Sequence, residues 1–337
     1  MRSESRSMKQ TKDVRKTVRG RALWHALAGI LLTGMILLPG CGRTEEDGSG
    51  QKWEKHITEE TLSIEGLDRE FTLLFLTDTH MVVPGENATE QERENEALRS
   101  PEFVNEEGVP SWEQFPGWIR YANENKVDAV LLGGDIIDTP SEANLKWLEE
   151  QLSQLEMPYL YVNGNHDWTY PWEYMTETGR ETYLPLLEPL MQDSTAIQRL
   201  DFGGFLVVGI DDSTNQVAPE ALETYENILK EDRPVIVMAH VPFMTQSVLA
   251  RAREAWGSPV VIGAGNFGGI YPNEDSERFT ALTLGADSPV ELVLAGHVHF
   301  YDRDVMEGEK QVLQLVGGAG FQGNAILLHV TGAGGAE

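Results

Sequence analysis

Short apolar runs rich in β-branched residues alternate with amphipathic segments along most of the chain. The runs span residues 71–77, 128–132, 158–162, 205–210, 234–239 and 290–295. Their length and the polar or turn-forming residues that bound them predict β-strands. Residues 117–126, 142–156 and 219–231 have apolar positions three and four apart, which predicts α-helices. This alternation predicts an α/β sandwich with at least partly parallel sheets.

The first 41 residues follow a different pattern. Up to Arg21, Lys and Arg outnumber acidic residues eight to two, and residues 22–38 then carry no formal charge. A basic segment followed by an apolar one is typical of an export signal. The apolar run ends at Leu-Leu-Pro-Gly before Cys41, which is the only cysteine of the chain. This arrangement resembles a bacterial lipoprotein signal, in which the thiol of Cys41 is lipidated.

Three interpretations of this leader remain open. Lipidation at Cys41 is favoured, while a retained membrane helix and plain secretion are the alternatives. A run of 17 apolar residues is at the short limit for a membrane span. All three interpretations place the rest of the chain outside the cytoplasm. We therefore expect an export signal at 1–41, a tether and lead-in at 42–66, and one domain at 67–332.

The charge of the chain limits its partners. Without residues 1–40, 18 Lys and Arg stand against 52 Asp and Glu, a formal net charge of −34. Such a surface repels nucleic-acid polymers and anionic headgroups at low salt. Long DNA or RNA is therefore a poor candidate substrate, and we expect a small one. Nothing in the sequence predicts a protein partner.

Polar residues cluster directly after the predicted strands. Five of the eight histidines fall there, together with several acids and one asparagine. In open α/β folds, ligands bind at the carboxyl ends of the strands. A single Asp after a strand is more often a cap or a turn former, so only the whole set predicts a site. Its members are Asp78, His80, Asp135, Asp138, Asn165, His166, Asp167, His240, His297 and His299.

These residues resemble the ordered motifs of the calcineurin-like metallophosphoesterase superfamily. The matches are Asp-x-His at 78–80, Gly-Asp-x-x-Asp at 134–138, Gly-Asn-His-Asp at 164–167, a single His240, and Gly-His-x-His at 296–299. The resemblance implies a sandwich of two mixed β-sheets flanked by helices. It also implies a binuclear metal centre that hydrolyses phosphate esters.

The resemblance assigns a role to each matched residue. It places Asp78, His80 and His299 on one metal, Asn165, His240 and His297 on the other, and Asp135 between both. It makes His166 the group that protonates the leaving alkoxide or polarises the phosphoryl group, oriented by Asp138. Mn, Zn or Fe are the divalent ions that this ligand set implies.

The chemistry asks for these residue types independently. Two divalent ions about 3.5–4 Å apart can lower the pKa of a water molecule and hold phosphoryl oxygens. Imidazoles and carboxylates are the ligands that such ions take. A spacing of two residues, as in Asp78/His80 and in His297/His299, can point both side chains to one face of an extended segment.

Two further segments carry weaker signals. Residues 84–116 hold nine Glu and two Arg, and we expect a long loop there, either a lid or a solvated insertion. Trp168, Tyr170 and Trp172 follow His166 and could bind substrate by stacking on a base or sugar, or pack under the loop. Asp167 fills the last position of its motif, or caps the following segment.

The sequence as a whole predicts a membrane-tethered, extracytoplasmic phosphoesterase. A metal-activated hydroxide would attack a small phosphomonoester or phosphodiester. The alternative is a non-catalytic surface protein that keeps the metals to hold its fold or to bind a partner. The presence of both His166 and Asp138, which a merely structural metal site does not need, favours the enzyme.

The leader generates the first testable prediction. The full chain should fractionate with membranes, and Cys41→Ala should change its processing, because several acyl chains at about 0.8 kcal/mol per buried methylene anchor a protein firmly. Gel mobility and membrane fractionation of the two proteins measure this. Unaltered processing of Cys41→Ala would rule out lipidation.

Overall fold

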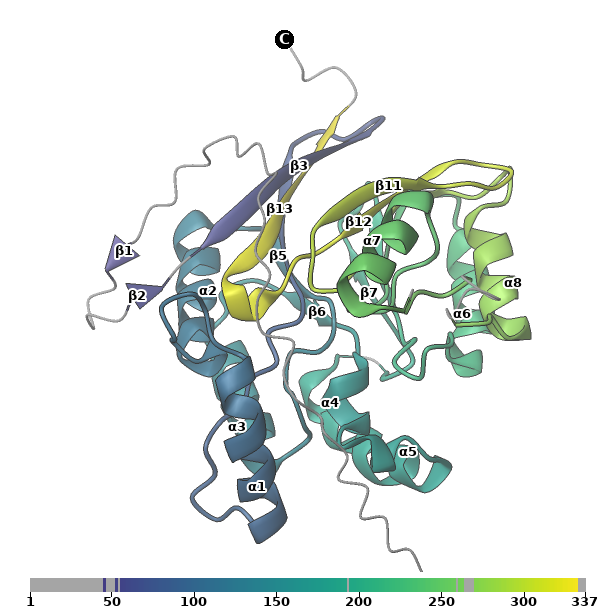
Figure 1. Ribbon diagram of the computed structural model, residues 1–337. Coiled ribbons are helices and arrows are strands. Elements are labelled where there is room, and N and C mark those ends of the chain that lie inside the picture. Colours follow the sequence, from purple (N-terminus) through teal and green to yellow (C-terminus); the bar gives the residue numbers. More distant parts are fainter. Residues whose placement is uncertain are drawn as a thin grey trace, which may run out of the picture. The chain divides into compact units, whose positions relative to one another are not determined.

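Figure 1 presents the computed structural model of the chain. The structure describes residues 45–46, 52–53, 55–192, 194–258, 260–263 and 270–332. The expected export signal and Cys41 lie outside the described residues, as does the side chain of Trp172. None of the described helices is long and apolar enough to cross a membrane.

Two mixed β-sheets form the centre of the fold. One has the strand order β3-β13-β4-β5-β6 and the other the order β11-β12-β10-β9-β8-β7. The five-stranded sheet consists of β3 (His56–Ile64), β13 (Asn324–Gly332), β4 (Phe71–Leu76), β5 (Ala129–Leu132) and β6 (Tyr159–Tyr161). The six-stranded sheet consists of β11 (Asp302–Met306), β12 (Val312–Val316), β10 (Val290–Ala295), β9 (Val235–Met238), β8 (Leu206–Ile210) and β7 (Ile197–Asp201). A separate short pair joins β1 (Glu45–Glu46) to β2 (Lys52–Trp53).

The strands nearest the predicted site run parallel. This holds for β4, β5 and β6 in one sheet and for β8, β9 and β10 in the other. Antiparallel neighbours, such as β13 beside β4 and β7 beside β8, make both sheets mixed. The expected α/β sandwich of two mixed sheets flanked by helices is confirmed.

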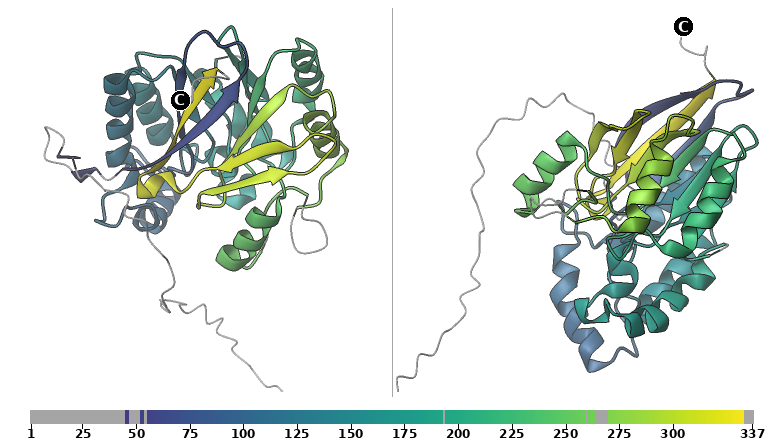
Figure 2. Two further views of the ribbon diagram at one scale, coloured as in Figure 1. Left: turned by 90° about the horizontal axis from the view of Figure 1, so that it is seen from above. Right: turned by 90° about the vertical axis from the view of Figure 1, so that its right-hand side faces the viewer.

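Helices cover the outer faces of both sheets (Figures 1 and 2). The helices are α1 (Glu90–Arg99), α2 (Ser111–Asn125), α3 (Glu142–Leu152), α4 (Asn165–Thr169), α5 (Glu177–Tyr183), α6 (Pro219–Leu229), α7 (Gln246–Trp256) and α8 (Glu274–Thr283). Short 3-10 helices span Ser100–Glu102, Trp172–Tyr174, Leu184–Leu190 and Gly320–Gln322. Side chains of α2 and α3 pack on the five-stranded sheet, and those of α6 and α8 on the six-stranded sheet.

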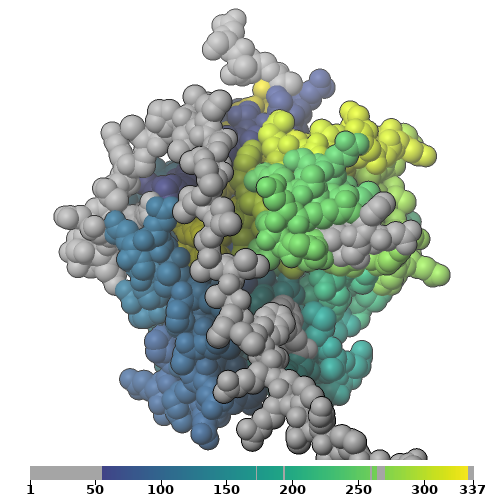
Figure 3. Space-filling model, viewed as in Figure 1, coloured from purple at the N-terminus to yellow at the C-terminus, as the bar shows by residue number. Residues whose placement is uncertain are grey.

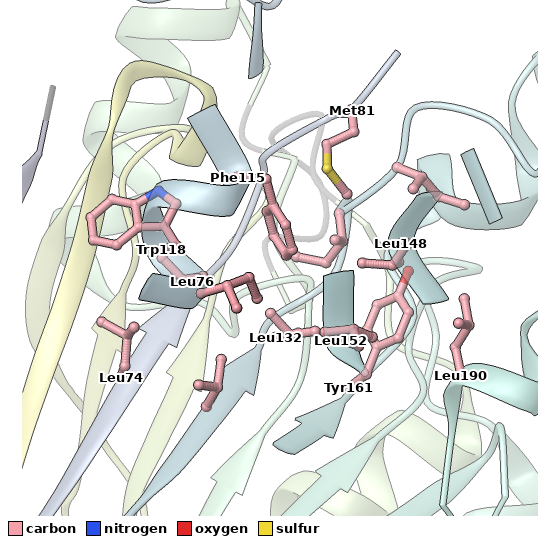
Figure 4. Packing of buried hydrophobic residues seen from close by; sticks show 14 of the residues in the cluster. Leu74, Leu76, Met81, Phe115, Trp118, Leu132, Leu148, Leu152, Tyr161 and Leu190 are labelled. Carbon is pink, nitrogen blue, oxygen red and sulfur yellow. The ribbon is translucent and has the colours of Figure 1, made fainter. Parts of the chain in front are cut away.

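Side chains alternate between the two faces of each strand, and this creates three apolar layers. One lies between the two sheets, and one lies on the outer face of each sheet. In β4, Leu73 and Phe75 point between the two sheets, while Leu74 and Leu76 point toward α2 and α3. All four side chains are buried. Figure 4 shows Leu74, Leu76 and Leu132 packing near Phe115 and Trp118 of α2, in the layer between the five-stranded sheet and its helices. Strands buried on both faces read as continuous apolar runs, which explains the pattern seen in the sequence.

All six predicted strands and all three predicted helices are present, and the strands differ from the prediction by one residue or none at each end. The sheet nevertheless begins at His56, inside the expected lead-in, because β3 pairs along its length with β13. Residues 84–116 are not one long loop. They contain α1, a 3-10 turn and the start of α2. The Thr89 side chain accepts from Glu92 N and the Glu92 side chain from Thr89 N, so a capping box starts α1.

The buried layers generate a stability prediction. Leu73→Ala should lower the free energy of unfolding by about 2–5 kcal/mol, because it leaves a cavity between two packed sheets. Leu98→Ala is the matched control, since that side chain is 63% exposed on α1. Urea unfolding of both variants measures the difference. Equal, small losses would contradict the packing described for Leu73.

Candidate metal centre

Unusual backbone conformations bring the predicted site residues together. Asp78, His80, Asp135, His297 and His299 all have φ between 44° and 71°. L residues rarely adopt this region, and such strained positions cluster at functional sites. Neighbouring turns hold the conformation, since Asp78 N donates to Gly134 O and His80 N to Asp135 O, at 3.0 and 2.8 Å. These backbone conformations direct side chains that follow different strands toward a common point.

Asp78, His80 and His299 form the first cluster. The Nε2 atoms of the two histidines lie 3.1 Å apart, and His299 Nε2 lies 3.4 Å from Asp78 Oδ1. His80 Nε2 lies 3.9 Å from the same carboxylate oxygen. One carboxylate and two imidazole nitrogens aimed at a common point are a donor set for a divalent cation.

Asp135, His240 and His297 form the second cluster. Asp135 Oδ2 lies 3.1 Å from His240 Nε2 and 3.7 Å from His80 Nε2, so this carboxylate faces both clusters. Asn165 Oδ1 is buried and accepts no hydrogen bond from any described residue. Because a buried amide oxygen without a donor is costly, a cation beside it is the partner that fits. The residues therefore fit divalent metal ions.

Further groups aim these side chains. His240 Nδ1 lies 2.8 Å from Gly133 O and donates to it, which leaves Nε2 to face the centre. The buried Asp212 carboxylate accepts from the backbone N–H groups of His240 and Val241. Asp78 accepts from His297 N at 2.9 Å. Gly134 must be glycine, because its φ is +88° and a Cβ would stand 2.5 Å from His240 Nδ1.

Burial and charge set the protonation of the histidines. Burial lowers the pKa of His80 to about 4 and that of His297 to about 3, so both rings are neutral and able to bind metal. Burial also lowers the pKa of His240, but Asp135 more than offsets this and raises it to about 10. A divalent cation would take the place of that proton between His240 and Asp135.

Asp138 and His166 form a pair beside the first cluster. His166 Nδ1 lies 2.8 Å from Asp138 Oδ1, and His80 Nδ1 lies 3.2 Å from the same oxygen. Burial opposes ionisation of Asp138, but hydrogen bonds from His166, His80 and Arg99 outweigh it and lower its pKa. Burial also opposes the charged form of His166, yet Asp135 and Asp138 raise its pKa. His166 lies within ligand distance of His80 and Asp135 as well.

Asp167 has a structural place in this site. Its oxygens accept from the backbone N–H groups of Asp135, Ile136, Ile137 and Gly164, at 2.6–3.0 Å. The fully buried carboxylate thus ties the loop after β5 to the loop after β6. This agrees with the interpretation of Asp167 as a cap of the following segment, α4.

The three aromatic residues expected at the substrate do not share one place. Trp168 is only 1% exposed, packs in the core and donates from Nε1 to Ser213 Oγ at 2.7 Å, which agrees with the packing interpretation of Trp168 rather than with stacking on substrate. Tyr170 is partly exposed and stacks on His166, with ring centroids 4.9 Å apart. The side chain of Trp172 lies outside the described residues.

Three contributors to the site were missed in the sequence. Arg99 contacts Asp138, and Phe103 stacks on His80 with centroids 4.3 Å apart. Both come from the segment expected to be a loop, and their partners are distant in sequence, so no local pattern indicates them. Asp212 comes just after the predicted strand 205–210, and this position could have indicated that it belongs to the site.

Comparison with known proteins gives a consistent family. A model described as calcineurin-like phosphoesterase matches residues 71–301. A protein from Helicobacter pylori named "uncharacterized metallophosphoesterase" is 24% identical over 222 residues, which are 64% of this chain and 50% of that protein. A "probable cyclic nucleotide phosphodiesterase" from Moraxella catarrhalis is 36% identical over 62 residues, 18% of this chain and 22% of that protein. The chain therefore spans about half the length, or less, of these curated relatives.

Solved structures are similar at lower identity. A dimetal phosphatase from Danio rerio has a TM-score of 0.43 at 13% identity, with 75% of this chain and 88% of that chain covered. A purple acid phosphatase from yellow lupin seeds has a TM-score of 0.47 at 15% identity, with 84% of this chain and 49% of that chain covered.

The geometry predicts how two substitutions change metal binding. Asp135→Asn should lower the bound metal, because it removes a charge that faces both clusters. His166→Ala should keep the metal, because the two clusters and Asn165 supply seven donors without it. Metal content after dialysis, measured by mass spectrometry, compares the two. If His166→Ala loses metal as fully as Asp135→Asn, His166 is a ligand.

Proposed function

The chain belongs to the calcineurin-like phosphoesterase family, and on that premise we propose that it hydrolyses small phosphate esters at a centre of two divalent metal ions. The observation that carries this proposal is the paired arrangement of donors. Two groups of ligand atoms stand next to each other, and Asp135 Oδ2 lies between His80 and His240. A single cation would leave one of these groups, or Asn165 Oδ1, without a partner.

Each ion would have its own ligands. Asp78, His80 and His299 would hold the first, and Asn165, His240 and His297 the second, with Asp135 shared. When bound, such ions lower the pKa of a water molecule and withdraw charge from phosphoryl oxygens. Imidazole and carboxylate donors suit Mn, Zn or Fe(II).

His166 would supply the proton that the leaving group of the ester needs. Its Nδ1 lies 2.8 Å from Asp138 Oδ1, so Nε2 is the nitrogen that can pass a proton to the departing oxygen of the ester. Asp138 is buried and its charge favours the protonated ring. Tyr170 covers one face of the ring and so limits its rotation. These contacts hold one proton donor in one orientation beside the first cluster.

The substrate class is argued from charge and from a relative. A strongly acidic chain disfavours long polyanions. The Moraxella catarrhalis relative is named as a probable cyclic nucleotide phosphodiesterase, which makes a diester as reasonable to test as a monoester. Because Trp168 is buried, stacking on that residue no longer supports a preference for nucleotides. The export pattern of residues 1–41 supports a location outside the cytoplasm, anchored to a membrane by lipid.

Hydrolysis of two chromogenic esters tests the proposal. The fragment from residue 42 should cleave p-nitrophenyl phosphate or its bis-ester with added Mn²⁺, and a chelator should abolish the reaction. His166→Ala should lower the rate on an ester with a poor leaving group by roughly 10²–10⁴-fold, the usual loss for an acid catalyst. A protein that binds its full metal complement and cleaves no phosphoester would favour the non-catalytic alternative.

A further inference from the structure

Helix α1 is attached to the protein in an unusual way. None of its ten described residues is buried, and its exposed surface is acidic. In Figures 1 and 2 it projects beyond the end of the sheets where the site lies, and in Figure 3 its blue surface belongs to the lobe at the lower left. Apolar packing therefore does not explain its position. Its last residue, Arg99, enters the site instead, with a side chain 14% exposed.

Arg99 holds both oxygens of Asp138. Its Nε lies 2.9 Å from Oδ2 and its Nη2 3.0 Å from Oδ1. This is the planar fork that fits a carboxylate at two points. His80 and His166, in contrast, both use Oδ1. Rotation of the carboxylate about its own axis would move Oδ1 away from both rings, and the fork opposes that rotation.

The guanidinium is itself fixed from several sides. Its Cζ lies 4.7 Å from the ring centroids of both Phe103 and Tyr170, a favourable placement for a cation. Phe103 stacks on His80 and Tyr170 on His166. Nη1 lies 2.7 Å from Glu102. Arg99 is therefore linked to each histidine in two ways. It holds Asp138, which contacts both rings, and it contacts the aromatic ring that stacks on each of them.

We propose that Arg99 is a positioning residue that sets the rotation of Asp138, so that one carboxylate aligns the metal ligand His80 and the proton donor His166 together. The segment 84–103 is then part of the active site rather than a lid over it. Its catalytic consequence rests on the proposed phosphoesterase function. Its structural consequence, the fixed orientation of His166, does not.

Kinetics separate positioning from simple stability. At saturating Mn²⁺, Arg99→Gln should lower kcat roughly 10–100-fold on phenyl phosphate, as loss of a group that orients a ligand or acid typically does, with little change in KM. On p-nitrophenyl phosphate, whose leaving group hardly needs a proton, the loss should be only a few-fold. Arg99→Lys keeps the charge but not the fork, so it should resemble Arg99→Gln.

Arg93→Gln is the matched control, because Arg93 lies on the same helix and contacts only the backbone oxygen of Ala88 among its described hydrogen bonds. It should leave both rates unchanged. Equal losses of Arg99→Gln on the two esters, or full activity of Arg99→Lys, would overturn the positioning role. If Arg99→Gln does not fold, Arg99→Lys alone decides, since the prediction for it is the same.

A spectroscopic measurement keeps this test separate from the proposed function. In the metal-free protein, the Nδ1–H resonance of His166, assigned with His166→Gln, should be sharp in the wild type and in Arg93→Gln. In Arg99→Gln and Arg99→Lys it should shift or be lost to exchange. If the wild type cleaves no phosphoester, the phosphoesterase proposal fails while this resonance still tests Arg99. An unchanged resonance in the Arg99 variants would contradict the proposal for Arg99.

Discussion

The buried carboxylate of Asp135 is the constraint on which the site depends. An anion removed from water is costly unless cations or hydrogen-bond donors surround it. Asp135 is 1% exposed, accepts from His166 N at 2.7 Å, and faces His80 and His240. Its backbone is held in turn by Asp167. These contacts require the loops after β4, β5, β6 and β9 to meet at one point, which only a fixed packing of the two sheets allows.

That packing explains why stability and chemistry are linked in this fold. Apolar side chains of both sheets interlock in the layer that contains Leu73 and Leu294. Within their sheets, β4, β5 and β6 run parallel, as do β8, β9 and β10, and site residues follow the ends of these strands. The layer thus sets the distance between ligands that come from different sheets, such as Asp78 and His297. Their direct contact, His297 N to Asp78 Oδ2 at 2.9 Å, closes the site across the two sheets.

The sequence predicts the two sheets and the site between them well, because the apolar runs indicate the strands and the polar motifs indicate the site residues. Strands buried on both faces appear as apolar runs, and polar groups at their ends appear as motifs. Prediction from the sequence fails for elements and side chains whose positions depend on contacts between distant parts of the chain. Helix α1 has no buried residue and hence no apolar stripe, although Thr89 and Glu92 form a capping pattern that the sequence does display. Trp168 packs in the apolar core, where Ser213, 45 positions away, satisfies its indole N–H, and no local pattern reveals that partner.

The central claim is that one shared carboxylate lies between two divalent ions. An anomalous difference map from crystals soaked in Mn²⁺ tests it most directly. The account predicts two peaks about 3.5–4 Å apart, one among Asp78, His80 and His299 and the other among Asn165, His240 and His297, with Asp135 touching both. A single peak, or two peaks that Asp135 does not join, would contradict it.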